Sequence, residues 1–503
     1  MSGYASGYAG ANEAEDRVWR AFASGSQVDL RAGADEDVRA GGSWGDERTV
    51  RAEVLKALLV GGQPGALRLA GARITGALDL GDTTVPHALT LDGCHLDRPV
   101  VLRGASLRST ELLRCRIPGL DGWLVRVDGN LFLEGSVIEG RLTLTRAHVT
   151  GELRLSGAEL TARELLDEGA GPDGPTPDPD GAAWALWAGG MVLDGGCFAR
   201  HGFTARGGLR LVGAQFNGGL FMERATVVNP RGDALSGDDL TASTLVLSDG
   251  FTAHGAIRLP GATVRSRFTL DGAVLDGALD APRLRAGDLR LTVAAVPTGP
   301  VDLQEAQVGV LHDNARSWPA DTRLDGFVYT SIEQPAADAA AVDRRLAWLE
   351  ALPGYAPQPY EQLAAWYRRI GHDDDARRVL LAKQRRRRRT LHPLGRLWGR
   401  LMDVTVGYGY RPWQAGLWLL VLTALGTVLF RHGTATPVQA GQGAPFNPLI
   451  YTLDLLIPIG GLGQRAAWYW TDYHQWVGYG LIAAGWVLTT AVLAGVTRSL
   501  NRG

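Results

Sequence analysis

An eleven-residue repeat runs through the middle of this chain and constrains the fold more than any other feature. Four consecutive units begin at residues 67, 78, 89 and 100: LRLAGARITGA, LDLGDTTVPHA, LTLDGCHLDRP and VVLRGASLRST. Each unit opens with two apolar residues separated by one position, and a third apolar residue follows seven positions after the first. The pattern weakens over 111–130 and then returns in further units up to residue 275. A period this regular indicates an architecture of stacked, equivalent units.

The spacing within each unit is typical of β-strands. Side chains of a strand alternate between two faces, so two leucines that flank one residue point to the same side. An α-helix with an eleven-residue repeat is the alternative, but nearly every unit contains glycine, which costs about 1 kcal/mol at each helical position. We therefore predict a mainly β fold with a right-handed parallel β-solenoid over 67–332, with two units per coil and roughly ten coils between residues 67 and 292.

The segments that flank or interrupt the repeat are interpreted as caps, a loop and a helical region. Residues 1–66 are predicted to form a helical cap, in which the apolar spacing of 49–60 indicates an amphipathic helix that covers the first coil. Residues 167–183 are rich in Pro, Gly and Asp and are predicted to be a loop inserted into the solenoid. From 337 to 400 the apolar period is helical, which predicts a small α-helical hairpin followed by a basic segment.

Two runs without charged residues, 413–430 and 476–496, lie near the end of the chain. A helix of that length can cross about 30 Å of hydrocarbon, so 401–503 is predicted to hold two transmembrane α-helices. Arginines before the first run and after the second place both termini in the cytoplasm by the positive-inside rule. The expected location is the bacterial inner membrane, and two buried helices of a soluble core are the alternative.

Cations and aromatic residues next to the first run are the expected anchors at the membrane interface. They are Arg385, Arg386, Arg387, Arg388, Arg389, Arg396, Arg400, Tyr408, Tyr410 and Trp413. The string TVGYG at 405–409 matches the selectivity filter of potassium channels. A filter requires a spanning helix and a pore helix ahead of it, and nothing before residue 405 has that character. We therefore assign this string to the interfacial belt.

The segment between the two runs, 446–463, is apolar, contains proline and is too short to cross a bilayer. It is predicted to be re-entrant or interfacial. An acid at membrane depth is a functional candidate, so Asp454, with Asn447 and Gln464, is a candidate polar residue of a pore. The alternative is an amphipathic segment on the outer surface. Two helices cannot enclose a pore alone, so the pore hypothesis requires a homo-oligomer.

No catalytic, cofactor-binding or metal-binding residue is predicted. Residues 461–466, GLGQRA, match a dinucleotide-binding fingerprint, but the segment between the two runs is too short for the βαβ domain that this fingerprint requires. Cys94, Cys115 and Cys197 are far apart and are expected to be reduced core thiols. A formal net charge of −2 argues against a nucleic-acid partner.

Four segments in order resemble a family of bacterial membrane proteins with a pentapeptide-like solenoid ahead of two C-terminal transmembrane helices. They are SWPADTRLDGFVY, PQPYEQLAAWYRRIGHDDDARRVL, TVGYGYRPWQA and FNPLIYTLDLLIPIGGLGQ. The resemblance covers nearly the whole chain, although the eleven-residue period departs from a strict five-residue repeat. Members are often labelled membrane-associated oxidoreductases, so the resemblance implies that activity, but it transfers no functional residue to this sequence.

Three functions follow from these expectations. The first is a membrane-anchored cytoplasmic scaffold or sensor whose two C-terminal helices form an oligomeric, pore-like module. The alternatives are a membrane-associated oxidoreductase, as the resemblance implies, and a passive membrane-tethered interaction scaffold. The expected partners are the lipid bilayer, further copies of the chain, and a protein that binds the solenoid or the helical hairpin.

Overall fold

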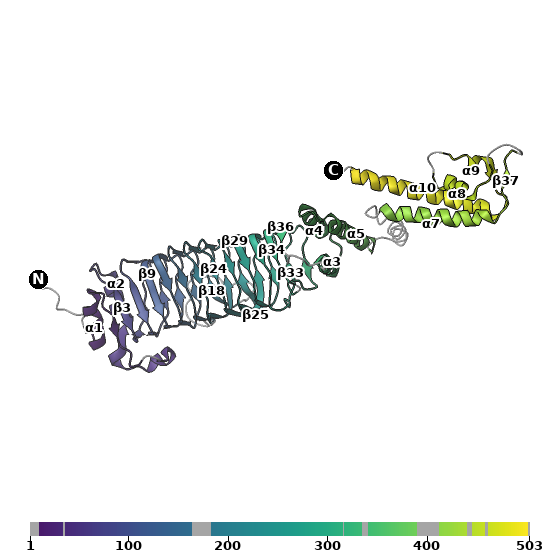
Figure 1. Ribbon diagram of the computed structural model, residues 1–503. Coiled ribbons are helices and arrows are strands. Elements are labelled where there is room, and N and C mark those ends of the chain that lie inside the picture. The colour runs from purple at the N-terminus through teal and green to yellow at the C-terminus, as the bar shows by residue number, and fades with distance from the viewer. Residues whose placement is uncertain are drawn as a thin grey trace, which may run out of the picture. The chain divides into compact units, whose positions relative to one another are not determined.

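The computed structural model describes residues 10–33, 36–162, 183–314, 316–333, 341–389, 412–439, 445–457 and 461–500. The chain divides into two compact units, Met1–Gln362 and Leu363–Gly503. We call the first the solenoid unit and the second the tail unit, and we describe each by itself (Figure 1).

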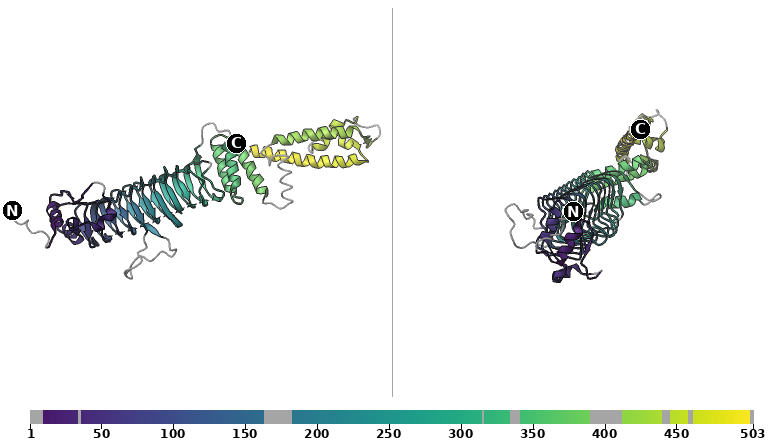
Figure 2. Two further views of the ribbon diagram at one scale, coloured as in Figure 1. Left: turned by 90° about the horizontal axis from the view of Figure 1, so that it is seen from below. Right: turned by 90° about the vertical axis from the view of Figure 1, so that its left-hand side faces the viewer.

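The solenoid unit is built on a parallel β-solenoid of about 12 turns, which Figure 2 shows from two further directions. Neighbouring turns pair in register at intervals close to 22 residues, as in Leu67 with Leu89 and Ile257 with Leu279. Two eleven-residue units therefore make one turn, and the predicted β-solenoid with this coil length is confirmed.

Each turn contributes to four parallel ladders. In the first turns these ladders pair Leu67 with Leu89, Arg73 with His95, Val100 with Leu120, and Thr84 with Ser106. The ladders join into two sheets, each with 18 strands among the described residues. The first sheet contains β1 (Val28–Asp29), β3 (Leu67–Ala70), β5 (Thr84–Val85), β6 (Leu89–Asp92), β9 (Ser106–Leu113), β12 (Arg126–Phe132), β15 (His148–Val149), β16 (Leu153–Arg154), β19 (Val192–Leu193), β20 (Cys197–Phe198), β23 (Gln215–Phe216), β24 (Leu220–Phe221), β26 (Thr241–Ala242), β27 (Leu245–Val246), β29 (Thr263–Thr269), β32 (Arg285–Arg290), β34 (Gln307–His312) and β36 (Val328–Ile332).

The second sheet runs along the same turns. It contains β2 (Thr49–Arg51), β4 (Arg73–Thr75), β7 (His95–Leu96), β8 (Val100–Val101), β10 (Arg116–Ile117), β11 (Leu120–Asp121), β13 (Val137–Ile138), β14 (Leu142–Thr143), β17 (Glu159–Thr161), β18 (Trp184–Trp187), β21 (Thr204–Arg206), β22 (Gly208–Arg210), β25 (Thr226–Ser236), β28 (Thr252–Arg258), β30 (Val274–Asp276), β31 (Leu279–Asp280), β33 (Val301–Asp302) and β35 (Thr322–Arg323). Most strands are short because the chain turns a corner after each pair of inward-facing residues.

The interior of the solenoid is a stack of apolar side chains. The paired leucines of each unit and the apolar residue seven positions after the first point inward, as with Leu142, Leu144 and Val149, all fully buried. Burial of such side chains is the main favourable term for a coil that contacts only its neighbours. The three cysteines are buried and free in this core. Burial raises the pKa of the Cys197 thiol to about 12, which makes it an unreactive core residue.

The N-terminal end of the solenoid is closed by strands and helices together. β1 pairs with β3 and β2 pairs with β4, so two of the four ladders of the first turn are continued into the cap by strands. The helices of this cap are α1 (Glu13–Phe22), η1 (Val38–Ser43), η2 (Asp46–Arg48) and α2 (Ala52–Val60). The apolar segment predicted as one helix over 49–60 thus begins as a strand, and α1 was not predicted.

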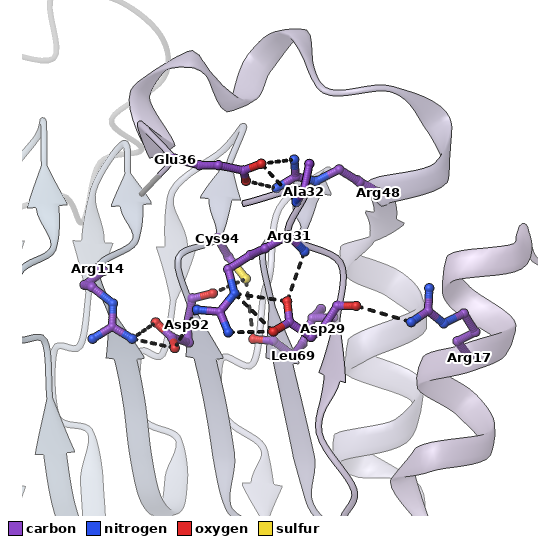
Figure 3. A network of polar contacts seen from close by, with 10 residues as sticks. All are labelled: Arg17, Asp29, Arg31, Ala32, Glu36, Arg48, Leu69, Asp92, Cys94 and Arg114. Atoms are coloured by element: carbon purple, nitrogen blue, oxygen red, sulfur yellow. Dashed lines mark hydrogen bonds and ion pairs between the residues drawn. The ribbon is translucent and has the colours of Figure 1, made fainter. Parts of the chain in front are cut away.

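Ion pairs link this cap to the solenoid (Figure 3). Asp92, on β6, accepts hydrogen bonds from Arg114 of the next turn and lies 3.6 Å from the guanidinium of Arg31 in the cap. Arg31 in turn forms a bidentate contact with Asp29 on β1. Asp29, Arg31, Asp92 and Arg114 thus form a row of alternating charges that runs from the cap onto the outer surface of the solenoid.

The C-terminal end of the solenoid is covered by helices that satisfy its last strand. Gln358 and Gln362 of α4 (Pro357–Arg369) donate side-chain hydrogen bonds to the carbonyl oxygens of Phe327 and Tyr329, at 2.9 Å and 2.7 Å. In α3 (Ala341–Ala351), Arg345 pairs with buried Asp313. These contacts occupy polar groups of an edge that would otherwise be free to pair with another strand.

The tail unit contains helices and one antiparallel pair of two-residue strands. Its elements after α4 are α5 (Asp373–Arg389), α7 (Pro412–Arg431), β37 (Thr436–Pro437), α8 (Pro448–Leu456), α9 (Gln464–Ala467), β38 (Trp468–Tyr469) and α10 (Tyr473–Leu500). Helices α7, α8 and α10 pack around a cluster of buried residues, and β37 pairs antiparallel with β38. The buried cluster consists of Phe430, Tyr451, Leu455, Leu456, Trp470 and Leu481.

The two predicted transmembrane helices are contradicted by the structure. Among the described residues, no helix has both the length and the apolar character that crossing a bilayer requires. The prediction took the absence of charge as apolarity, yet the described part of α10 begins with Tyr473, His474 and Gln475 and contains further glycines and threonines. The predicted multi-pass location in the bacterial inner membrane, with both termini cytoplasmic, is wrong for the same reason.

Lowering the pH is expected to loosen the N-terminal cap through Glu15. Although burial alone would raise the pKa of Glu15, hydrogen bonds from Arg51 hold the pKa below the ordinary 4.5. The ion pair between Glu15 and Arg51 therefore stabilises the folded state above pH 4.5, and this stabilisation is lost as the pH falls through the lowered pKa of Glu15. We expect the urea midpoint of the wild type to fall in acid, and that of Glu15→Gln to start lower and depend less on pH. Parallel pH profiles for the two proteins would contradict this assignment.

Candidate functional site

The three polar residues predicted for a pore lie close together in the tail unit. Asn447 caps α8, because its side-chain oxygen accepts the N–H groups of Leu449 and Ile450. The backbone N–H of Asn447 donates to Oε1 of Gln464 at 3.3 Å, and Nε2 of Gln464 donates to the carbonyl of Pro445 at 3.1 Å. Asn447 and Gln464 therefore join the start of α8 to the start of α9.

Asp454 is the third of these residues, and it is almost fully buried. Its two carboxylate oxygens accept the backbone N–H groups of Leu462 and Arg465, each at 2.7 Å. Arg465 lies in the first turn of α9, where a negative charge is favourable. The carboxylate of Asp454, on α8, thus holds the backbone of Leu462 and Arg465 against α8. This is a structural role. Its predicted place in a membrane pore depended on the two transmembrane helices that the structure contradicts.

The tail unit also contains an Asp–His pair, Asp472 and His474, that was not predicted from the sequence. His474 is buried, and its Nδ1 lies 2.7 Å from Oδ2 of Asp472. Its Nε2 is buried without a hydrogen-bond partner among the described residues. Burial acts to raise the pKa of Asp472, but the hydrogen bonds from His474 outweigh it and hold that pKa below its usual value.

The ring of His474 is enclosed by aromatic residues. The rings of Tyr473 and Trp470 lie 4.1 Å and 4.6 Å from it. A Cβ on Gly433 would meet the Trp470 ring at 2.4 Å, so only glycine fits at that position without a shift. The closely spaced acid and histidine in TDYH were the one sequence signal for this pair, but nothing in the sequence indicated their burial.

The predicted interface anchors do not form one site. Arg385, Arg386, Arg387, Arg388 and Arg389 belong to the last turns of α5, where cations complement the helix dipole. Trp413 belongs to the first turn of α7. Arg396, Arg400, Tyr408 and Tyr410 lie outside the described residues, as does the TVGYG string.

The outer surface of the solenoid carries a second candidate site, at Arg141 and Trp187. Trp187 ends β18, which pairs directly with β14, and Arg141 immediately precedes β14. The guanidinium carbon of Arg141 lies 4.3 Å from the ring centroid of Trp187, and that of Arg210, on the next turn, lies 5.8 Å from it. We call this group the Arg141–Trp187 site.

Arg141 differs from the arginines that stack on other aromatic rings of the solenoid. Those arginines also pair with carboxylates at 2.6–2.8 Å. The pairs are Arg48 with Glu36, Arg103 with Asp121, Arg154 with Glu152, and Arg200 with Glu223. No carboxylate among the described residues pairs with Arg141, and burial lowers the pKa of its guanidinium. Nε of Arg141 and Nε1 of Trp187 are both buried donors without an acceptor among those residues.

The remaining sequence candidates are not assembled into a reactive centre. The described residues contain no group of three or more His, Cys, Asp or Glu side chains placed to hold a metal ion. In the GLGQRA string, Gly463 precedes the four-residue helix α9, and the element before it is helix α8 rather than a strand. Among the described residues, no strand leads into this string as the dinucleotide fingerprint requires.

No protein-family model, curated protein or solved structure matches this chain. The resemblance to bacterial pentapeptide-like membrane proteins therefore stays a prediction.

Replacing Asp454 with asparagine should destabilise the tail unit. The amide has one accepting oxygen, so one of the two N–H groups that Asp454 holds would lose its acceptor in a buried place. A buried donor without a partner costs about 1–3 kcal/mol. We expect a lower unfolding midpoint for Asp454→Asn, measured by tryptophan fluorescence, with Asp374→Asn as the control, because the side chain of Asp374 is 94% exposed. Equal midpoints for Asp454→Asn and the wild type would rule out the structural role.

Proposed function

We propose that this chain is a binding scaffold, whose solenoid holds an acidic segment of a partner protein at the Arg141–Trp187 site. The β-solenoid fold supports the proposal, because its interior is filled with apolar side chains and its polar groups are displayed on a long outer surface. Extended surfaces of this kind are what stacked-repeat proteins use for recognition.

The observation that carries the proposal is the pair of donors without acceptors. A partly buried guanidinium loses hydration, and that loss is compensated in most proteins by a carboxylate. Arg141 lacks one among the described residues, and the neighbouring indole N–H of Trp187 also lacks an acceptor. A carboxylate has two oxygens and forms strong, charge-assisted hydrogen bonds with arginine. A partner carboxylate could therefore pair with the guanidinium of Arg141, which is only partly buried.

The charges around the site favour a protein carboxylate over a polyanion. Other arginines that stack on aromatic rings of the solenoid, such as Arg103 and Arg154, are already neutralised by acidic residues. Nucleic acids bind through many cations at once, whereas this site is built on one arginine, Arg141, stacked on an aromatic ring. An aspartate or glutamate flanked by apolar residues matches that combination.

A fluorescein-labelled peptide that carries one glutamate between leucine residues is a suitable probe for this site. We expect the full chain to bind it, and Arg141→Gln to bind at least about tenfold more weakly, since a lost charged contact of this kind costs about 2 kcal/mol or more. The measurement is fluorescence anisotropy at several salt concentrations. Trp187→Leu should weaken binding as well.

Arg103→Gln is the matched control. Arg103 also lies near an aromatic ring, Trp123, but it pairs with Asp121 at 2.8 Å. Its replacement should leave binding within about twofold of the wild type if the unpaired charge is what matters. Equal binding by Arg141→Gln and the wild type would overturn the proposal, and so would full competition by single-stranded DNA at low concentration.

A further inference from the structure

Helix α7 is apolar on two sides. Leu419, Leu422 and Phe430 face the core of the tail unit. A second set of aliphatic side chains lies on the opposite side and is between 47% and 69% exposed. This set consists of Leu417, Leu420, Val421, Leu425 and Val428. A surface helix of a soluble domain normally has a polar outer face, so α7 departs from that rule.

Helix α10 has the same property, with aromatic residues. Val477, Leu481 and Ile482 pack on the core, while a stripe on the other side is between 53% and 75% exposed. The stripe consists of Tyr473, Trp476, Tyr479 and Trp486. Their spacing of three to seven residues places them along one side of the helix.

The exposed apolar area of α10 alone is close to the most that a monomer usually tolerates. A full aromatic side chain offers about 200 Å², so the four aromatic residues of α10 leave on the order of 500 Å² in water. The largest apolar patch of a typical monomer is about 300–600 Å², and the outer face of α7 is additional. A standard interface takes about 800 Å² from each partner. The two faces together are therefore of the size that a stable dimer buries.

The outer faces also lack charge. No Asp, Glu, Lys or Arg occurs from Trp413 to Phe430 or from Trp476 to Thr490. Charged groups usually give an interface its specificity for a different protein, and these faces have none. A second copy of the chain carries the same uncharged faces at the same concentration, and symmetric association is the commonest form of protein assembly.

We propose that a second copy of this chain covers the outer faces of α7 and α10. The resulting dimer would hold two solenoids through their tail units. This inference does not rest on the Arg141–Trp187 site, and either can fail without the other. If both hold, the dimer presents two binding sites to one partner.

The test is the mass of the full chain by sedimentation velocity over a range of concentrations without detergent. We expect a dimer or a larger closed assembly for the wild type. Leu420→Glu on α7 or Trp476→Glu on α10 should shift the dissociation constant at least tenfold towards the monomer, because each places a charge in the apolar interface. Val274→Glu, an exposed apolar position on the solenoid, is the matched control and should leave the mass unchanged. Circular dichroism establishes that each variant remains folded.

Three results would overturn the proposal. One is a wild-type monomer in detergent-free buffer. Another is undiminished association of the folded variant that carries both glutamates. The third is a chain that stays in solution only with detergent or phosphatidylcholine vesicles and is monomeric there, which would identify lipid as the occupant of these faces.

Discussion

The stacking of inward apolar side chains at an interval close to 22 residues is the constraint on which the solenoid unit depends. Each ladder places a leucine, valine or phenylalanine of one turn on its equivalent in the next, as with Leu131 and Leu153. Because every turn contacts only its neighbours, the same arrangement must be satisfied again in each turn. The two ends are the exceptions, and they are closed by β1 and β2 on one side and by the glutamines of α4 on the other.

The sequence was sufficient for this repeat and for its coil length, since both follow from local spacing. It was insufficient where tertiary pairing overrides the pattern. Over 111–130 the repeat fades, yet Arg116 still pairs with His95 and Leu120 with Val100, because the neighbouring turns impose the register. The strand at the start of 49–60 has the same origin, since Val50 pairs with Ile74.

The candidate sites were less predictable because they depend on contacts between distant residues. Asp454 stood out as an acid in an apolar segment, but only the structure shows that backbone N–H groups occupy its carboxylate. Uncharged runs were interpreted as membrane spans because charge is visible in a sequence, whereas the packing of α7, α8 and α10 is not. Arg141 was not singled out at all, since the absence of a carboxylate beside it is a property of the folded turns.

The interior of the solenoid repeats from turn to turn, whereas its surface does not. The interior explains why the chain folds, and the surface is where recognition has to occur. Unpartnered donors at the Arg141–Trp187 site and uncharged outer faces on α7 and α10 are departures from the pattern that most of the surface follows. These two departures are the observations on which the two proposals rest.

Deletion of one turn tests the central claim of in-register stacking most directly. Removing 131–152 joins Asn130 to Leu153, so Leu153 takes the place of Leu131 and every ladder remains in register. Removing only 131–147 leaves the later turns paired with one another but breaks the register between the turns on either side of the deletion. We expect the first deletion to keep the β-sheet circular dichroism and a single cooperative unfolding transition, whereas the second should unfold in two separate transitions. Loss of the fold in the full-turn deletion, or equal tolerance of the two deletions, would contradict this claim.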